Sequence, residues 1–177
     1  MDDIQQTIQT IGTDRLLLRH WREDDAEALF KYASDPRVSE LALWPCHTSV
    51  DMSREVIREV FMPNPYSYAM ILKETGEAIG CMGLVPAGSE HYKPLEGEME
   101  VGYWVGHPYW NKGLTSEALN GFIGYCRDVL HLGSLLITTD DSNKASQRVA
   151  VKCGFSPIAA YDYGSTPSRA FRLPLGV

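Results

Sequence analysis

Three features that define large classes of protein are missing from this 177-residue sequence. No segment contains the roughly 20 consecutive apolar residues that a membrane-spanning helix needs. Residues 1–9 lack the basic start and the apolar centre of a secretion signal. The formal net charge is −7, and no run of lysine and arginine offsets it, which argues against nucleic-acid binding. We therefore expect a cytoplasmic protein with neither a membrane nor a nucleic-acid partner.

Cysteine and histidine are scarce and widely spaced. No two of the four cysteines form a Cys-x-x-Cys pair, and all four lie in largely apolar stretches, as buried reduced thiols of a cytosolic protein do. The five histidines show no His-Glu-x-x-His or comparable ligand spacing. We expect no structural or catalytic metal.

The composition is that of an ordinary globular protein, with 44% hydrophobic and 22% charged residues. No internal repeat, low-complexity tract or linker divides the chain. We predict an N-terminal extension over residues 1–12 and a single domain over residues 13–177. Its oligomeric state, monomer or homodimer, stays open at this stage.

The centre of the chain consists of a strand, a polar turn and a long helix. Residues 98–105 alternate between apolar and other side chains with period two, which predicts a strand. From Leu114 to Leu130, apolar residues recur at helical spacing. The turn between them contains Lys112 and Gly113. The first N–H groups of a helix have no partner within it and lie at the positive end of its dipole, so we expect an anion site here, most commonly for a phosphate.

Shorter patterns complete a predicted order of strands and helices. Asp35-Pro36 and Met62-Pro63 should end the first two helices, and residues 74–77 should connect a hairpin. Gly80 and Gly83 within a strand indicate close approach of a neighbouring element. The expected elements are strands at 15–19, 68–72, 78–85, 98–105 and 135–139, helices at 24–33, 51–61, 114–130 and from 143, and two C-terminal strands ending at Leu173.

Two segments resemble a known family. Tyr-Trp-Asn-Lys-Gly-Leu-Thr-Ser-Glu-Ala at 109–118, and Asn-Lys-Ala-Ser with Val-Ala-Val-Lys-Cys-Gly-Phe within 143–155, are similar to the acetyl-CoA-binding core of the GNAT N-acetyltransferases of the RimJ/RimL type. Thr-x-Arg-Leu-x-Leu-Arg at 13–19 and Trp44-Pro45 also match. The resemblance implies an α/β fold with a central mixed, mostly antiparallel twisted sheet, helices on both faces and the order β-α-α-β-β-β-α-β-α-β-β.

The same resemblance implies transfer of an acetyl group from acetyl-CoA to a primary amine, at a site built from two segments. The pyrophosphate loop would run from Trp110 to Thr115. Family members usually have glycine where Asn111 stands, and asparagine adopts left-handed backbone more easily than most residues. Asn143 would lie near the pantetheine amide. The implied cofactor-binding residues are Trp104, Val105, Trp110, Asn111, Lys112, Gly113, Leu114, Thr115, Asn143 and Ser146.

Catalytic roles follow from the chemistry of acetyl transfer. The family splits its sheet beside the strand that ends near Val105, which frees a main-chain N–H for the thioester carbonyl. The resemblance places Ser146 near the sulfur as the proton donor, and Glu100 is the candidate base. Two other interpretations of the acidic strand face stay open: it meets only water, or the acceptor is an α-amino group whose pKa near 8 makes a base unnecessary.

Simpler interpretations stay open for other residues too. Lys112 suits a solvated surface position, and Asn143 suits a helix cap. A non-catalytic acetyl-CoA-binding or partner-binding domain would keep the loop and lack turnover. A P-loop phosphohydrolase is disfavoured, because the Gly-x-x-x-x-Gly-Lys-Ser/Thr motif is absent. The sequence does not identify the acceptor amine, which is either a protein N-terminus or a small molecule.

Overall fold

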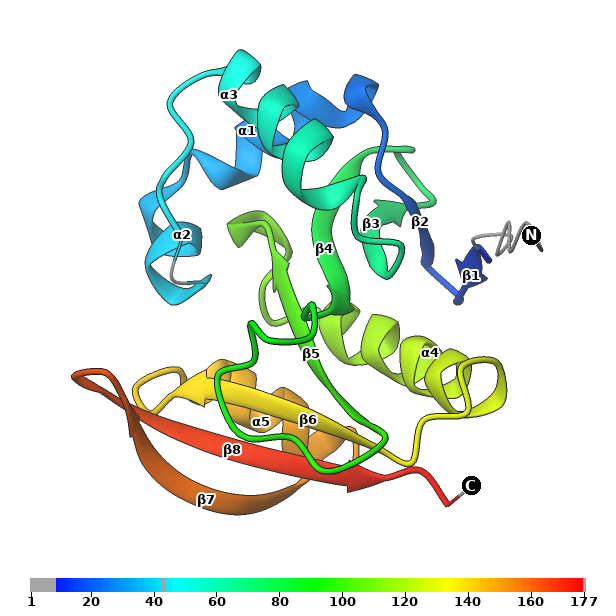
Figure 1. The fold of residues 1–177 in the computed structure, drawn as a ribbon. Coiled ribbons are helices and arrows are strands. Elements are labelled where there is room, and N and C mark those ends of the chain that lie inside the picture. Colours follow the sequence, from blue (N-terminus) through cyan, green and yellow to red (C-terminus); the bar gives the residue numbers. More distant parts are fainter. Residues whose placement is uncertain (1–8, 43, 177) are drawn as a thin grey trace, which may run out of the picture.

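The computed structural model of the chain describes residues 9–42 and 44–176. Eight strands form one sheet in the order β1-β2-β3-β4-β5-β6-β8-β7 (Figure 1). Every neighbouring pair is antiparallel except β5 and β6, which are parallel. The strands are β1 (Ile11–Gly12), β2 (Leu16–His20), β3 (Ser67–Leu72), β4 (Ala78–Leu84), β5 (Glu98–Val105), β6 (Ser134–Asp140), β7 (Ser156–Tyr163) and β8 (Thr166–Pro174).

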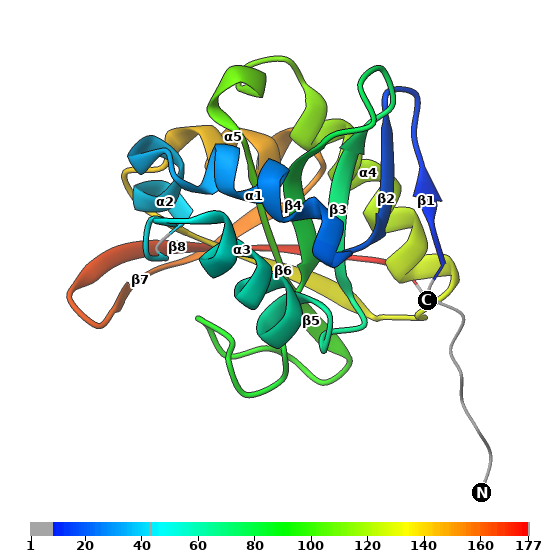
Figure 2. The same cartoon turned by 90° about the horizontal axis from the view of Figure 1, so that it is seen from above.

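Helices cover both faces of this sheet (Figure 2), as predicted. They are α1 (Ala26–Ala33), α2 (Pro36–Ala42), α3 (Val50–Val56), α4 (Leu114–Asp128) and α5 (Lys144–Lys152). On one face, Leu29 of α1 belongs to a core cluster with Trp21 and Ile71. On the other face, Leu119 and Phe122 of α4 belong to the larger core cluster. The apolar residues that recur at helical spacing in the sequence therefore form the buried side of α4.

The predicted order of elements is confirmed, with two additions. The sequence did not predict β1, whose two residues pair with β2 and lie within the predicted extension, or α2. We expected Asp35-Pro36 to end helical structure, and α1 does end at Ala33. However, Pro36 is the first residue of α2, a position where a missing N–H costs nothing. The predicted helix 51–61 is present as α3 followed by a π-helical turn over Ile57–Phe61.

The two glycines of β4 mark places where backbones approach closely, as predicted. A Cβ atom on Gly80 would lie 2.4 Å from the carbonyl oxygen of Trp104. One on Gly83 would lie 2.4 Å from that of Tyr66. Side chains at these positions would push β4 away from its neighbours, so Gly80 lets β5 approach β4 closely and Gly83 does the same for the start of β3.

A split opens between β5 and β6. The two strands pair only where Glu98–Glu100 meets Ser134–Leu136, and β5 continues to Val105 while pairing with β4 alone. The N–H of Gly106 donates to Ile79 O at 2.8 Å. Because successive N–H groups of a strand point to opposite edges, the N–H of Val105 faces the split. The split expected from the resemblance is therefore present.

Within residues 9–42 and 44–176, no helix is long and apolar enough to cross a membrane. The same residues contain no group of three or more His, Cys, Asp or Glu side chains arranged to hold a metal ion. All four cysteines are free thiols.

Candidate active site

The turn that leads into α4 has an unusual backbone. Gly113, at the N-cap of α4, has φ 75° and provides no side-chain cap for the helix. Asn111 also has a positive φ, 58°, so asparagine here takes the left-handed conformation for which the family uses glycine. The first N–H groups of α4 are consequently not capped by Gly113 and point out of the helix end.

An ion pair fixes this turn to the start of β2. The Arg15 guanidinium donates to the Glu117 carboxylate (2.7 Å) and to the carbonyl oxygen of Lys112 (2.9 Å). Thr13 Oγ1 and Arg15 N also donate to Glu117, at 2.6 and 2.7 Å. Burial alone would raise the pKa of Glu117, but these hydrogen bonds outweigh it and hold the pKa below its usual value. Glu117 therefore stays charged and keeps the turn in place.

A cavity of about 600 Å³ extends from this turn to the start of α5. Nine of the ten residues predicted to bind the cofactor line it, namely Trp104, Val105, Trp110, Asn111, Gly113, Leu114, Thr115, Asn143 and Ser146. Lys112 is the exception, and its ammonium lies over the Tyr109 ring, 5.6 Å from the centroid. Two cations, Arg148 and Lys152, also line the cavity. An uncapped helix start, a left-handed glycine and two cations suit a long phosphate-bearing ligand, so the residues present fit coenzyme A.

A second cavity, of about 640 Å³, lies on the other side of β5. It is bounded by α2, α3, α5 and the strands β3 to β8. The two cavities share Tyr103, Trp104, Asn143 and Ser146, together with Leu41 and Ala42 of α2. No lysine or arginine is among the residues that line the second cavity. The two cavities thus meet at the split and differ in charge.

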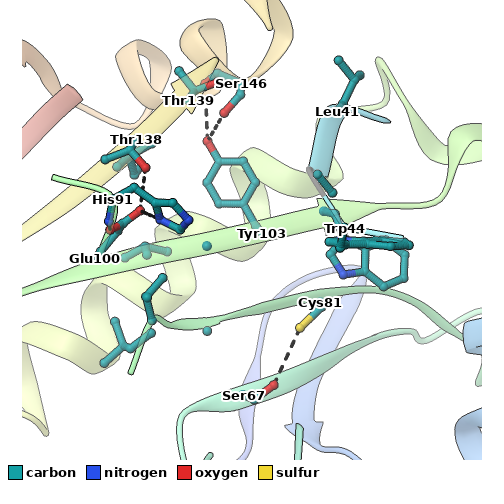
Figure 3. A pocket seen from close by; sticks show the side chains of 18 of the residues that line it. Leu41, Trp44, Ser67, Cys81, His91, Glu100, Tyr103, Thr138, Thr139 and Ser146 are labelled. Carbon is teal, nitrogen blue, oxygen red and sulfur yellow. Dashed lines mark hydrogen bonds and ion pairs between the residues drawn. The ribbon is translucent and has the colours of Figure 1, made fainter. Parts of the chain in front are cut away.

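Ser146 lies at this junction beside a tyrosine that sequence reasoning missed. The hydroxyl oxygens of Ser146 and Tyr103 are 3.1 Å apart (Figure 3). Burial raises the pKa of Tyr103 to about 12, so its hydroxyl keeps its proton at neutral pH. Asn143 Oδ1 accepts from Ser146 N at 3.1 Å and caps α5. Tyr103 was missed because it alternates with apolar residues of β5 and was assigned to the core side.

Glu100 lies in the second cavity and accepts three hydrogen bonds. His91 donates from its backbone N (2.8 Å) and its Nδ1 lies 2.9 Å from Glu100 Oε1, while Thr138 Oγ1 donates at 2.5 Å. Glu100 is 3% exposed, so these partners replace water around the carboxylate. The hydrogen bond to Glu100 raises the pKa of His91, against the lowering effect of burial. His91 was also missed, because a single histidine in a polar loop carries no spacing signal.

Glu98 shares the strand face of Glu100 and has a different environment. Arg172 and Ser134 donate to its carboxylate, at 2.5 and 2.8 Å for Oε1, and it does not line either cavity. Burial alone would raise the pKa of Glu98, but these donors and Leu95 N hold it below its usual value. Glu98 therefore connects β5 to β6 and β8 and does not face a ligand.

Cys81 is the cysteine that lines a cavity. Its Sγ lies 3.8 Å from Ser67 Oγ. Burial raises the pKa of this thiol to about 11, so almost none of it is thiolate at neutral pH. Because the thiolate is the nucleophilic form, Cys81 is a poor acceptor for an acyl group.

Comparison with known proteins agrees with this geometry. Residues 15–156 match the model of the acetyltransferase (GNAT) domain family. The chain is 31% identical over 155 residues to the uncharacterized N-acetyltransferase p20 of Bacillus licheniformis, which covers 84% of this chain and 83% of that protein. A GNAT-family acetyltransferase structure from Bacillus anthracis superimposes with a TM-score of 0.81 at 21% identity, covering 96% and 100% of the two chains.

A further structure, of the ribosomal L7/L12 α-N-protein acetyltransferase RimL in complex with coenzyme A, superimposes with a TM-score of 0.78 at 17% identity and covers 94% of this chain and 98% of that one. The family match spans most of the chain, and the split sheet and uncapped helix start are where the resemblance placed them. The chain therefore belongs to the GNAT family of acetyl-CoA-dependent N-acetyltransferases, in its RimJ/RimL-like branch.

Proposed function

We propose that this enzyme moves the acetyl group of acetyl-CoA directly to a primary amine, with the cofactor in the cavity at α4 and the amine in the cavity beside Glu100. The observation that supports this most strongly is the contrast between the two cavities that meet at Ser146 and Tyr103. The first has cations and the uncapped helix start, which suit phosphates. The second has carboxylates and no lysine or arginine, which suits an amine that arrives as an ammonium ion.

The cofactor side would use the backbone more than side chains. We assign the pyrophosphate to the N–H groups from Asn111 to Thr115, with Arg148 and Lys152 beside it. Trp110 Nε1–H donates to Val105 O at 2.9 Å, which fixes the end of β5. We assign the N–H of Val105 to the carbonyl oxygen of the thioester. The Lys112 side chain lies outside the cavity, so we expect only its backbone to take part.

The leaving thiolate needs a hydrogen-bond donor, and two hydroxyls are available at the junction. Ser146 keeps the role expected from the sequence, and Tyr103 joins it because their oxygens are in contact. Either hydroxyl can donate to the other, so one proton of the pair is left for the sulfur. Acting together, they would stabilise negative charge that exists only as the C–S bond breaks.

On the amine side, we propose that Glu100 acts through His91. With its oxygens already occupied by three donors, the carboxylate is poorly placed to take another proton. If His91 Nδ1 carries the proton shared with Glu100, Nε2 is the nitrogen that can accept one from the amine. A carboxylate that fixes the tautomer of a histidine base is a common catalytic arrangement.

This pairing predicts how Glu100→Gln changes the titration of His91. Below its pKa, His91 is charged and cannot accept a proton, and the hydrogen bond to Glu100 raises that pKa above the ordinary 6.5. Removing the carboxylate should lower the pKa of His91, which histidine-selective NMR titration would measure. The acid limb of kcat/KM should move to lower pH with it. An unchanged His91 pKa would contradict the pairing.

Direct transfer predicts that Cys81 is dispensable. Cys81→Ala should keep kcat within a few-fold of the wild type, because the protonated thiol cannot form a thioester efficiently. Mass spectrometry of the wild type with acetyl-CoA, in the absence of amine, should show no acetylated Cys81. An acetyl-cysteine that forms and then disappears on addition of amine would replace direct transfer with a two-step mechanism.

Two measurements test the function as a whole. Calorimetry in the presence of EDTA should show acetyl-CoA binding, and release of free thiol should depend on an added amine. Binding without release across a broad set of amines would favour a non-catalytic acetyl-CoA-binding domain. Absence of binding at physiological cofactor concentrations would overturn the cofactor assignment.

A further inference from the structure

The cavity assigned to the amine has an apolar arm that the transfer reaction itself does not explain. Trp44 and Leu41 lie on the opposite side of Tyr103 from His91 and Glu100 (Figure 3). The Trp44 ring meets the Trp104 ring edge to face, with centroids 5.6 Å apart, so an aromatic wall stands at the junction of the two cavities. The arm continues from Trp44 along side chains of α3, its π-helical turn and β4, namely Met52, Val56, Val60, Phe61 and Leu84.

Two polar side chains in this arm, those of Asn64 and His47, already have partners within the protein. Asn64 donates to Leu84 O at 3.0 Å and accepts from Tyr66 N at 3.0 Å. His47 Nδ1 lies 2.7 Å from Ser53 Oγ, and burial lowers the pKa of His47, so this histidine is neutral at pH 7. The arm therefore presents mainly carbon to a ligand. A peptide would bring a backbone N–H and C=O with every residue, and these groups would find few free partners here.

Charge narrows the choice further. The ionisable acids that line the cavity are Glu100 and Asp140, and no lysine or arginine is among its lining residues. A carboxylate or phosphate on the acceptor would have no lysine or arginine to pair with and would meet these two acids. This disfavours free amino acids. A long polyamine would place a second ammonium ion in the apolar arm, where no carboxylate is present to pair with it.

Two apolar residues at the edge of the arm are exposed. Val60 is 58% exposed and Leu41 is 38% exposed, although both line the cavity. Exposed apolar side chains that continue into a cavity indicate an entrance for an apolar group. The cavity of about 640 Å³ lies within the range of small-molecule sites.

We propose that the acceptor is a small monoamine with an aromatic or bulky apolar body and no carboxylate, which is placed in the arm beside Trp44 while its nitrogen lies near His91. This inference rests on the proposed function, since it names the substrate class of the same site. The aromatic wall would hold the body of the amine, and the acidic end would hold its ammonium group before transfer.

The test compares acceptors that differ by one feature each. 2-Phenylethylamine should have a kcat/KM at least about tenfold higher than ethylamine, after correction for the free-base fraction of each, because a ring in an apolar pocket contributes at least as much as single methylene groups do. Phenylalanine, which adds only a carboxylate to phenylethylamine, should be a much poorer acceptor. Spermidine and a peptide with an N-terminal serine should also be poorer.

Variants then assign the preference to the arm. Trp44→Ala should reduce the phenylethylamine-to-ethylamine ratio about tenfold or more, and Trp44→Phe should preserve most of it. Val60→Ser changes only an exposed residue at the entrance, so it should fold and lower the ratio in the same direction. Val129→Ser makes the same change at another exposed valine, which lines neither cavity, and should leave the ratio unaltered.

The outcomes separate this inference from the function on which it rests. Acetylation of ethylamine, spermidine or the peptide as efficiently as phenylethylamine would overturn the inference and leave the amine acetyltransferase intact. A ratio unaffected by Trp44→Ala and Val60→Ser, with both variants folded, would also overturn it. Acetyl-CoA binding with no acetylation of any amine would overturn the proposed function and the inference together.

Discussion

Loss of both hydroxyls at the junction, as Ser146→Ala with Tyr103→Phe, should lower kcat by about 10²- to 10⁴-fold, the usual range for a general acid. The affinity for acetyl-CoA should change little, because the sulfur gains negative charge only as the bond to carbon breaks. Each single variant should lose less than the double variant, since one hydroxyl remains, 3.1 Å from the place of the other. Single-turnover kinetics with calorimetric Kd values would measure both quantities.

The matched control is Tyr66→Phe, which removes a hydroxyl from a partly buried tyrosine that lines neither cavity. It should leave kcat and Kd near wild-type values. Four kcat values then complete a double-mutant cycle for Ser146 and Tyr103. Strictly additive single effects would show that the two hydroxyls act separately. Turnover at the wild-type rate in the double variant would move the donor elsewhere, to a bound water or another side chain.

The second large effect is expected at the turn before α4. Gly113→Asp should weaken acetyl-CoA binding about 100-fold or more, because it places a negative charge at the helix end that we assign to the pyrophosphate. Aspartate tolerates a φ of 75° better than most residues, and its nearest neighbour at the Cβ position is the Arg15 guanidinium at 3.6 Å. The variant should therefore fold, with the new carboxylate close to Arg15.

Gly113→Asn separates charge from shape. Asparagine has nearly the same size as aspartate and adopts left-handed backbone equally well, so it keeps the steric change without the charge. We expect at most about a tenfold loss of affinity for Gly113→Asn, by calorimetry on both variants. Similar losses for the two variants would assign the effect to shape alone. Undiminished affinity in a folded Gly113→Asp variant would remove this turn from the site.

The parts of the fold that the sequence predicted are those with a long local signal. The apolar repeat of α4, the alternation of β5 and the hairpin around Gly76 each depend on neighbouring residues, and all three are present. The missed elements are short: β1 has two residues, and α2 begins at a proline that usually marks a helix end. Neither is long enough for periodicity to be recognised.

The candidate site divides in a similar way. The turn around Gly113 and the start of α5 are contiguous in sequence, so their motifs could be recognised from the residues alone. Tyr103 and His91 gain their positions from packing across the fold, through Ser146 on α5 and Glu100 on β5. The split itself depends on where the β5–β6 ladder ends, and that depends on long-range packing that no local pattern encodes.

The short ladder between β5 and β6 should make the stability of the protein depend on bound cofactor. Three residue pairs join these strands. By contrast, five or more residue pairs join β2 to β3, β3 to β4, β4 to β5, β6 to β8 and β8 to β7. A ligand that binds in the split only when the protein is folded adds its binding free energy to folding, about 2.7 kcal/mol at 100 times Kd. Backbone amides of residues 101–105 should then exchange hydrogen more slowly with acetyl-CoA present. By the same linkage, proteases should cleave the enzyme more slowly in saturating acetyl-CoA than in its absence.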